Sequence, residues 1–213
     1  LGAMARSLVT CTEAKAAAIQ ELQAPSHSSN GIATGSGTDG VIVVSNPQSP
    51  TRLTNAGKNT KLGEYIGVTV KAAVKEALAR QSGLTPAHQH NVLHRLGRFG
   101  VTEDALWELC RDKSPTRAEF TRRLEILAAD SRLVTWAALY AHLLDETEWG
   151  LLSGGEACVA AKELLALSGL PEQESDASNA RGRAGKASET TVNILSRRYL
   201  DAFARKIICT ADE

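Results

Sequence analysis

The chain has 213 residues, and its 24 lysines and arginines balance 24 aspartates and glutamates, so the formal net charge at pH 7 is zero. Nucleic-acid-binding proteins need an excess of cations to displace counterions from phosphates, and this balance argues against that class. Hydrophobic residues make up 43% of the chain and charged residues 23%, which is ordinary for a globular protein. We also find no apolar run near the roughly 18 residues of a membrane span and no signal-peptide pattern.

The cysteines stand singly in the sequence, at Cys11, Cys110, Cys158 and Cys209. Without a CxxC pair, a zinc ribbon or a redox dithiol is disfavoured, and a disulfide framework is not expected at this length. We therefore expect a cytoplasmic protein with reduced thiols, no membrane partner and no metal site.

Residues 1–83 mix helical and strand patterns. Residues 1–22 are rich in alanine and free of proline, which predicts a helix, and residues 62–81 carry an apolar residue every four positions, which predicts another. Between them, a glycine-rich stretch at 34–40 precedes the β-branched run Val41-Ile42-Val43-Val44-Ser45. That run predicts a buried strand.

The rest of the chain divides into three segments. Residues 84–170 predict a helical subdomain, and the polar residues 171–189 predict a flexible linker. Residues 190–213 predict a strand at 190–196 followed by a helix. We expect an α/β fold, in which a mixed sheet containing Val41–Val44 and Val192–Leu195 is covered by the helices of residues 1–83. The last segment would then complete the α/β core.

Two helical segments resemble each other. Leucine, two alanines and arginine recur at the same offsets in Leu1–Val9 and Leu200–Ile208. Two alanine-rich helices can match by chance. The alternative is that the end of the chain re-enters the element with which the sequence begins.

The glycine-rich stretch offers polar groups beside the predicted strand. Backbone N–H groups of Gly35 and Gly37 can approach a ligand closely. Hydroxyls and a carboxylate follow in the same stretch, from Thr34, Ser36, Thr38 and Asp39. It is not a P-loop, because no GK[ST] follows, nor a dinucleotide motif, because a strand and not a helix comes next. Taken alone, the stretch is equally well explained as a tight β-turn.

Three segments together are more specific. TEAKAAAIQEL, then ATGSGTDGVIVV, then AGKNTKLGEYIG stand in this order over about residues 1–80. They resemble the adenosylcobinamide amidohydrolase (CbiZ) family, with Ser36 where the family usually has threonine. The third segment keeps the family pattern at Gly57, Thr60, Leu62, Gly63 and Glu64.

A fourth segment fits the same family more loosely. Ser178-Asn179-Ala180-Arg181, Gly185 and Thr191-Val192-Asn193-Ile194 resemble a stretch that in the family precedes the TEAK helix. Here it comes last. Two interpretations stay open, a circularly permuted domain or a fragment whose tail begins a second copy. The helical region lies outside the family core.

The resemblance implies hydrolysis of the amide that joins a corrin side chain to aminopropanol, giving adenosylcobyric acid. Such chemistry needs an activated water or hydroxyl, an acid and oxyanion donors. The candidate catalytic residues are Glu13, Asp39 and Thr38. The candidate substrate-binding residues are Thr12, Lys15, Thr34, Gly35, Ser36, Gly37, Thr60, Glu64, Asn179, Arg181 and Asn193.

Plainer explanations exist for several candidates. Glu13 and Lys15 also fit a solvated helix face, Glu64 a favourable charge at a helix N-terminus, and Asn179 a turn cap. No cofactor is expected, because the cobalt corrinoid is the substrate and the small-molecule partner. A homo-oligomer is compatible with the sequence.

Two rival functions stay open. One is a non-catalytic corrinoid-binding module and the other a degenerate structural domain. The histidine group His88, His90 and His94 lacks a nearby carboxylate or cysteine at ligand spacing. It therefore predicts a solvated basic helix face and not a metal site.

Overall fold

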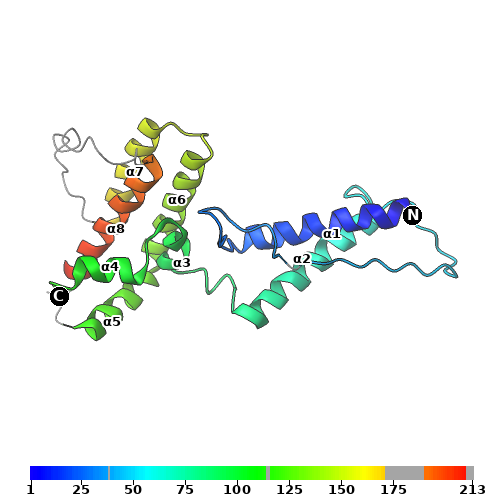
Figure 1. Ribbon diagram of the computed structural model, residues 1–213, viewed down its shortest axis with the longest axis horizontal. Helices are drawn as coiled ribbons and strands as arrows, with labels where there is room; N and C mark the ends of the chain where they lie inside the picture. Colours follow the sequence, from blue (N-terminus) through cyan, green and yellow to red (C-terminus); the bar gives the residue numbers. More distant parts are fainter. Residues whose placement is uncertain (38, 114–115, 171–189, 210–213) are drawn as a thin grey trace. The chain divides into compact units, whose positions relative to one another are not determined.

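A computed structural model of the chain describes residues 1–37, 39–113, 116–170 and 190–209. The chain divides into two compact units, Leu1–Gln89 (unit 1) and His90–Glu213 (unit 2). Both units are helical wherever regular structure is described (Figure 1). None of the described helices combines the length and apolar character that crossing a bilayer requires.

Unit 1 is built on two helices, α1 (Gly2–Glu21) and α2 (Lys61–Ser82), which pack against each other. Thr60 caps α2, since its hydroxyl accepts a hydrogen bond from Gly63 N at 3.1 Å. Thr10 in the middle of α1 contacts Ala56 just before α2, and Glu21 at the end of α1 contacts Lys71 in the middle of α2, so the helices run parallel. A long irregular connection joins them.

Unit 2 contains the remaining described helices. Their bounds are α3 (Val92–Leu96), the 3₁₀ turn η1 (Gly97–Phe99), α4 (Glu103–Cys110), α5 (Arg117–Ala128), α6 (Ser131–Glu148), α7 (Gly154–Ser168) and α8 (Thr191–Cys209). Side-chain caps start several of them, most completely at α7, where Ser153 and Glu156 form a capping box. Helix α6 packs against α3, α7 and α8, and α8 also packs against α4. The unit is therefore a helical bundle around one core.

Aromatic side chains on α6 and α8 anchor that core. Tyr140 and Tyr199 are buried, with ring centroids 4.9 Å apart in a tilted arrangement. The Tyr140 hydroxyl donates to the backbone carbonyl of Leu195 at 3.0 Å. Burial raises the pKa of the Tyr199 phenol, so this group stays neutral.

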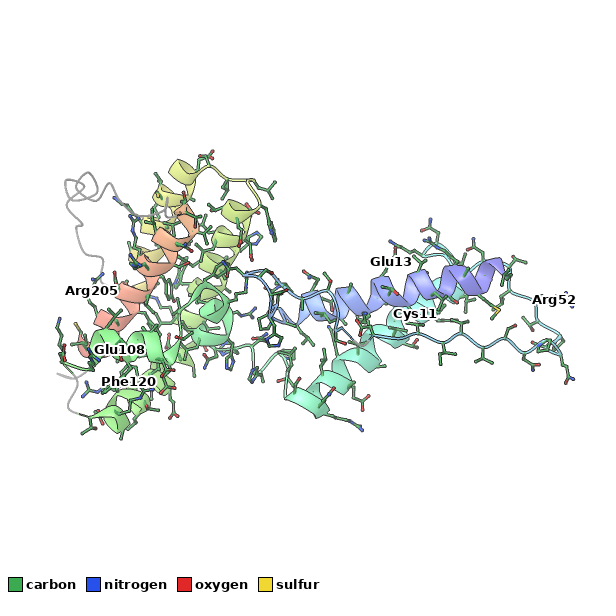
Figure 2. All side chains as sticks on the ribbon, in the orientation of Figure 1. Cys11, Glu13, Arg52, Glu108, Phe120 and Arg205 are labelled. Atoms are coloured by element: carbon green, nitrogen blue, oxygen red, sulfur yellow. The ribbon has the colours of Figure 1, made fainter. Side chains whose placement is uncertain are left out.

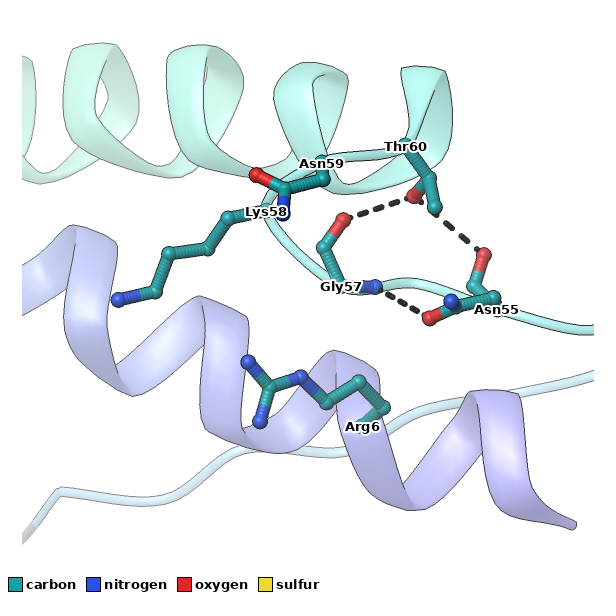
Figure 3. A pocket seen from close by; sticks show the side chains of 6 residues that line it. All are labelled: Arg6, Asn55, Gly57, Lys58, Asn59 and Thr60. Atoms are coloured by element: carbon teal, nitrogen blue, oxygen red, sulfur yellow. Dashed lines mark hydrogen bonds between the residues drawn. The ribbon is translucent and has the colours of Figure 1, made fainter.

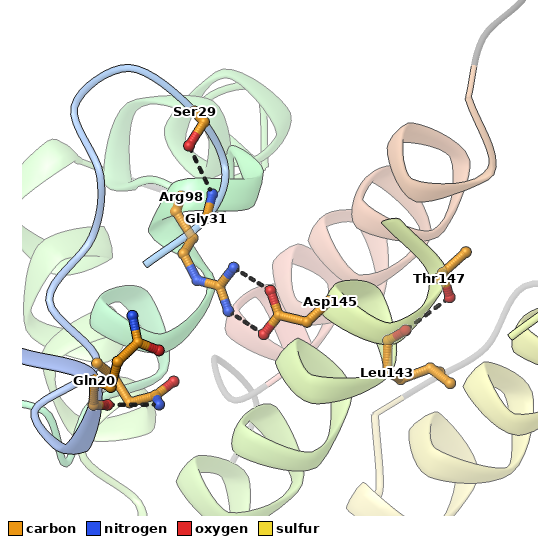
Figure 4. Close-up of polar contacts among 8 residues, drawn as sticks. Gln20, Ser29, Gly31, Arg98, Leu143, Asp145 and Thr147 are labelled. Atoms are coloured by element: carbon orange, nitrogen blue, oxygen red, sulfur yellow. Dashed lines mark hydrogen bonds and ion pairs between the residues drawn. The ribbon is translucent and has the colours of Figure 1, made fainter. Parts of the chain in front are cut away.

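A buried ion pair joins η1 to α6 in unit 2. Arg98 in η1 binds Asp145 on α6 through two parallel hydrogen bonds of 2.6 Å (Figure 4). Both side chains are almost completely buried. The Arg98 guanidinium also stacks over the Phe99 ring, 4.2 Å from its centroid. The bidentate geometry fixes η1 on α6.

The predicted α/β fold with a mixed sheet is wrong. In the described residues the β-type contact is an isolated antiparallel bridge between Pro25 and Ile32, and no sheet forms. Residues 41–45 are not a paired strand. Their β-branched side chains favour extended backbone locally, but a sheet also needs a partner strand, which the described part of the chain does not supply.

The strand predicted at 190–196 is also wrong, because these residues open helix α8. Val192, Leu195, Tyr199 and Phe203 are buried on one face of α8, in the core of unit 2. Their spacing of three or four residues is helical. The pattern continues past the seven residues that resemble a strand. The last segment therefore belongs to the core of unit 2, and it does not complete an α/β core with residues 1–83.

Candidate functional site

Small residues let α1 and α2 approach closely. Ala14 and Ala17 on α1, with Gly63 and Gly67 on α2, line a groove of about 390 Å³ between the two helices. A side chain at Gly63 is not tolerated there, because its Cβ would lie 2.0 Å from the carbonyl oxygen of Gly57. The Thr10 hydroxyl on α1 donates a hydrogen bond of 2.9 Å to the carbonyl of Ala56, which lies just before α2. The shape of the groove therefore depends on these small residues and on the Thr10 hydrogen bond.

Two of the predicted site carboxylates line this groove. Glu13 comes from α1 (Figure 2) and Glu64 from the first turn of α2, with Lys58 and Lys71 beside them. One Glu13 oxygen, Oε1, pairs with Lys58 Nζ at 3.2 Å. Its other oxygen, Oε2, is buried and lacks a hydrogen-bond partner among the described residues. A buried acceptor without a donor is uncommon and leaves Glu13 able to accept a hydrogen bond.

The glycine-rich turn forms a second polar cluster. Asp39 pairs with Lys15 of α1, and its carboxylate accepts hydrogen bonds from Ser36 N at 2.8 Å and Ser36 Oγ at 3.1 Å. These bonds, led by that from Lys15, lower the pKa of the Asp39 carboxyl below its usual value. Asp39 is therefore ionised at neutral pH and is unsuited to act as the acid.

The absence of a side chain at Gly35 leaves room for this ion pair. A Cβ at Gly35 would lie 2.4 Å from Asp39 Oδ2 and 3.1 Å from Lys15 Nζ. The Gly35 backbone thus passes directly under the Lys15–Asp39 pair. The turn is closed partly by its own side chains, as the simpler β-turn interpretation anticipated. Gly37 and Thr34 are exposed on the same turn.

The two clusters use different faces of α1. Glu13 and Lys15 are two residues apart, which is about 200° around a helix. Glu13 faces the groove toward α2, whereas Lys15 holds Asp39 of the glycine-rich turn. The predicted catalytic residues Glu13 and Asp39 are thus not brought into one cluster, and Thr38 lies outside the described residues.

A basic hollow adjoins the groove at the start of α2. Figure 3 shows its lining, and its volume is about 450 Å³. Arg6, Lys58 and the amides of Asn55 and Asn59 line it together with Thr60. Thr60 Oγ1 donates to the Gly57 carbonyl at 2.8 Å, so its hydroxyl is engaged in shaping the turn. Lys58 lines both the hollow and the groove.

Sequence reasoning missed Arg6 and Lys58. The sequence contained a pattern that could have pointed to each of them. Lys58 lies inside the third family-like segment, and Arg6 stands seven positions before Glu13 on the same face of α1. Glu64, which sequence reasoning did select, pairs with Lys61 at 2.8 Å at the helix start.

The remaining candidates are placed elsewhere. Thr12 donates to the Leu8 carbonyl of its own helix at 3.0 Å. Asn193 lies on α8 in unit 2, whereas the glycine-rich turn lies in unit 1. Asn179 and Arg181 lie outside the described residues. The expectation that Thr191–Leu195 shares a sheet with Val41–Val44 is wrong, so the structural reason for grouping Asn193 with the turn is lost.

His90 and His94 are not arranged as a pair of metal ligands on one helix. His94 lies on α3, but His90 precedes the first residue of that helix, so the two do not share a helical face. Among the described residues, histidine, cysteine, aspartate and glutamate side chains nowhere gather in a group of three that could hold a metal ion.

Comparison with known proteins finds a likeness within unit 1. Residues 1–86 match the family model of adenosylcobinamide amidohydrolase (CbiZ), which confirms the resemblance over that part of the chain. An uncharacterised protein of Methanocaldococcus jannaschii is 47% identical over 81 residues, which are 38% of this chain and 31% of the relative. The match thus spans about a third of the relative's length. No solved structure matches the chain significantly.

Proposed function

We propose that unit 1 contributes to an amidohydrolase site that cleaves the aminopropanol amide of adenosylcobinamide to give adenosylcobyric acid. The observation that carries the proposal is the family match over residues 1–86. It is supported by the groove between α1 and α2, where Glu13, Glu64 and Lys58 lie together. The cobalt corrinoid is the substrate, and no further cofactor is invoked.

The proposal assigns a chemical role to two side chains of the groove. In the proposed reaction the Glu13 carboxylate accepts a proton as a water oxygen bonds to the amide carbon. The carbon–nitrogen bond then breaks, and that proton goes to the departing amine. In the same proposal Lys58, which is 3.2 Å from Glu13 Oε1, stabilises negative charge that develops on the amide oxygen.

The remaining unit 1 candidates are assigned to binding. Thr34 and Gly37 are exposed on the glycine-rich turn and can contact a large ligand. Lys15, Ser36 and Asp39 hold the turn in shape through their mutual bonds. In this proposal they position the turn and do not take part in proton transfer.

A second function, a non-catalytic corrinoid-binding module, is favoured by one observation. Glu13 and Asp39 lie in clusters on different faces of α1. An acid and a base that act on one amide must both reach it. If Asp39 were essential to the chemistry, the arrangement would bind substrate without turning it over.

A single assay separates these functions. The full chain is incubated with adenosylcobinamide, and mass spectrometry follows adenosylcobyric acid and free aminopropanol. The proposal predicts both products in equal amounts, and a reaction without protein serves as the control. Binding in equilibrium dialysis without products would establish the module, and absence of binding would overturn both functions.

A further inference from the structure

The basic hollow at the start of α2 is lined by cations and amides. Arg6 of α1 and Lys58 supply two positive charges, and Asn55 and Asn59 supply side-chain amides. Among the described residues, no aspartate or glutamate lines the hollow. A concave surface that carries charge of one sign concentrates ions of the opposite sign. The lining therefore favours an anionic ligand.

Several donors in the hollow are not engaged by the protein. Within the described part of the chain, no hydrogen bond or ion pair engages the Arg6 guanidinium or the Asn59 amide (Figure 3). The side-chain oxygen of Asn55 accepts a hydrogen bond from Gly57 N at 2.8 Å, which leaves the Asn55 NH₂ group to donate. A ligand that only accepts hydrogen bonds would satisfy all three side chains.

Gly57 allows the Arg6 side chain to lie against the turn before α2. A Cβ at Gly57 would lie 3.6 Å from Arg6 Nε and 3.1 Å from Asn55 Oδ1. The guanidinium and the Asn55 amide thus line the hollow from neighbouring positions. Because the planar guanidinium presents paired donors that match the two oxygens of a carboxylate, Arg6 is the group best suited to hold such a ligand.

Lys58 connects the hollow with the groove between α1 and α2. It lines both of them, and its side chain is 63% exposed. Arg6 and Glu13 stand seven positions apart, which places them on one face of α1. A ligand whose amide lies in the groove therefore has the hollow beside it. Hydrolysis replaces an uncharged amide by a carboxylate, which is ionised at neutral pH.

We propose that the basic hollow binds the carboxylate that amide hydrolysis produces, with Arg6 as its main contact. The inference rests on the proposed function and deepens it. Because the substrate amide carries no negative charge, the hollow binds adenosylcobyric acid in preference to adenosylcobinamide at this group. The product therefore stays bound beside the groove and competes with the next substrate molecule.

Equilibrium dialysis of the full chain with each corrinoid tests the preference. Arg6→Met is expected to weaken the binding of adenosylcobyric acid at least about tenfold, because a charge-assisted hydrogen bond is lost. The change for adenosylcobinamide should be much smaller. Arg6 is exposed, so the variant should keep its helical circular dichroism. Arg52→Met removes the same charge from an exposed position outside the hollow, and it should bind both corrinoids normally.

Inorganic phosphate tests the hollow without a corrinoid. In an isotope-labelled full chain, phosphate is expected to give saturable shifts of the amide signals of residues 57–60. Sodium chloride at equal ionic strength is the control for general screening of charge. Arg6→Met should abolish the saturable shifts. This titration separates the affinity of the hollow for an oxyanion from the identity of the molecule that carries it.

Two results would overturn the inference. One is binding of adenosylcobyric acid that is absent or indifferent to Arg6→Met, and the other is a phosphate titration without saturable shifts. Failure of the proposed function gives a different pattern. Binding of adenosylcobyric acid through Arg6 without hydrolysis of adenosylcobinamide contradicts the hydrolysis alone. Hydrolysis by a chain that binds adenosylcobyric acid no better than its Arg6→Met variant contradicts the role of the hollow alone.

Discussion

Glu13 carries the clearest chemical assignment of any side chain in unit 1. Its Oε2 atom is buried without a partner among the described residues, while Oε1 is held by Lys58. Asp39, by contrast, has its oxygens engaged by Lys15 and Ser36. Sequence reasoning treated the two carboxylates alike, because the bonds that distinguish them come from tertiary contacts.

Glu13→Gln is expected to lower the rate of adenosylcobinamide hydrolysis by about 10²- to 10⁴-fold, since the amide keeps the shape but cannot accept the proton. Product formation measured by mass spectrometry checks this. Glu76→Gln is the control, because Glu76 is an exposed partner of Arg80 on α2, and it should keep full activity. Equal rates for Glu13→Gln and the unmodified chain would remove Glu13 from the mechanism.

A second prediction concerns the contribution of Asp145 to the stability of unit 2. Asp145→Ala is expected to lower the free energy of unfolding by about 3–5 kcal/mol, because it leaves the buried Arg98 charge without its partner. Urea denaturation followed by circular dichroism measures the change. Replacing both residues, with Arg98→Met and Asp145→Leu, should recover much of the loss. A small effect of Asp145→Ala would show that water reaches Arg98.

At the level of elements, charge helps hold α1 to α2. Glu21 near the end of α1 accepts hydrogen bonds from Lys71 at 2.7 Å and Lys75 at 2.5 Å, both on α2. These two bonds lower the pKa of Glu21 to about 2. Alanines and glycines line much of the groove between the two helices, and such small residues bury little apolar area each.

The attachment of α2 is therefore expected to be acid-sensitive. A carboxyl whose pKa is lowered in the folded state stabilises that state fully above its ordinary pKa near 4.5 and loses this effect as pH falls toward about 2. The protection of α2 amides, which is the slowing of hydrogen exchange relative to the intrinsic rate at the same pH, should fall over this range. Glu21→Gln should already exchange faster at pH 6 and lose much of the acid dependence. An unchanged pH profile in that variant would contradict the assignment.

Helices were predictable here and strands were not. The alanine-rich residues 1–22 and the four-residue spacing of 62–81 carry their own helical signal, and the structure confirms both helices. The runs at 41–45 and 190–196 carry only local β propensity. The first lacks a partner strand among the described residues, and in the second a helical spacing continues through Tyr199 to Ile207. Sheet pairing depends on residues distant in sequence, so short apolar runs do not settle it.

The candidate site was predictable to a similar degree. The family-like segments located the groove and the turn, because Glu13, Glu64 and Asp39 lie within them. Their division between two faces of α1 follows from helical geometry once the helix is known. The positions of Lys58 and Arg6 beside the groove and the hollow follow only from how the turn before α2 folds back on α1.

Over the whole molecule, the two units differ in how much core they contain. Unit 2 buries a continuous cluster that includes Leu144, Leu165 and Phe203, whereas the buried residues of unit 1 are mostly small, such as Ala14 and Ala18. Fewer buried apolar contacts mean a smaller free energy of local opening. The units should therefore differ in stability, although one chain connects them.

Hydrogen exchange of the full chain is expected to show this difference directly. Amides in the middle of α2 should exchange at least about tenfold faster than those in the middle of α6, after correction for intrinsic rates, because α2 opens with less loss of buried apolar surface. Mass spectrometry of proteolytic peptides measures both helices in one experiment, so α6 is an internal control. Equal protection of the two helices would show that α1 and α2 form a self-sufficient unit.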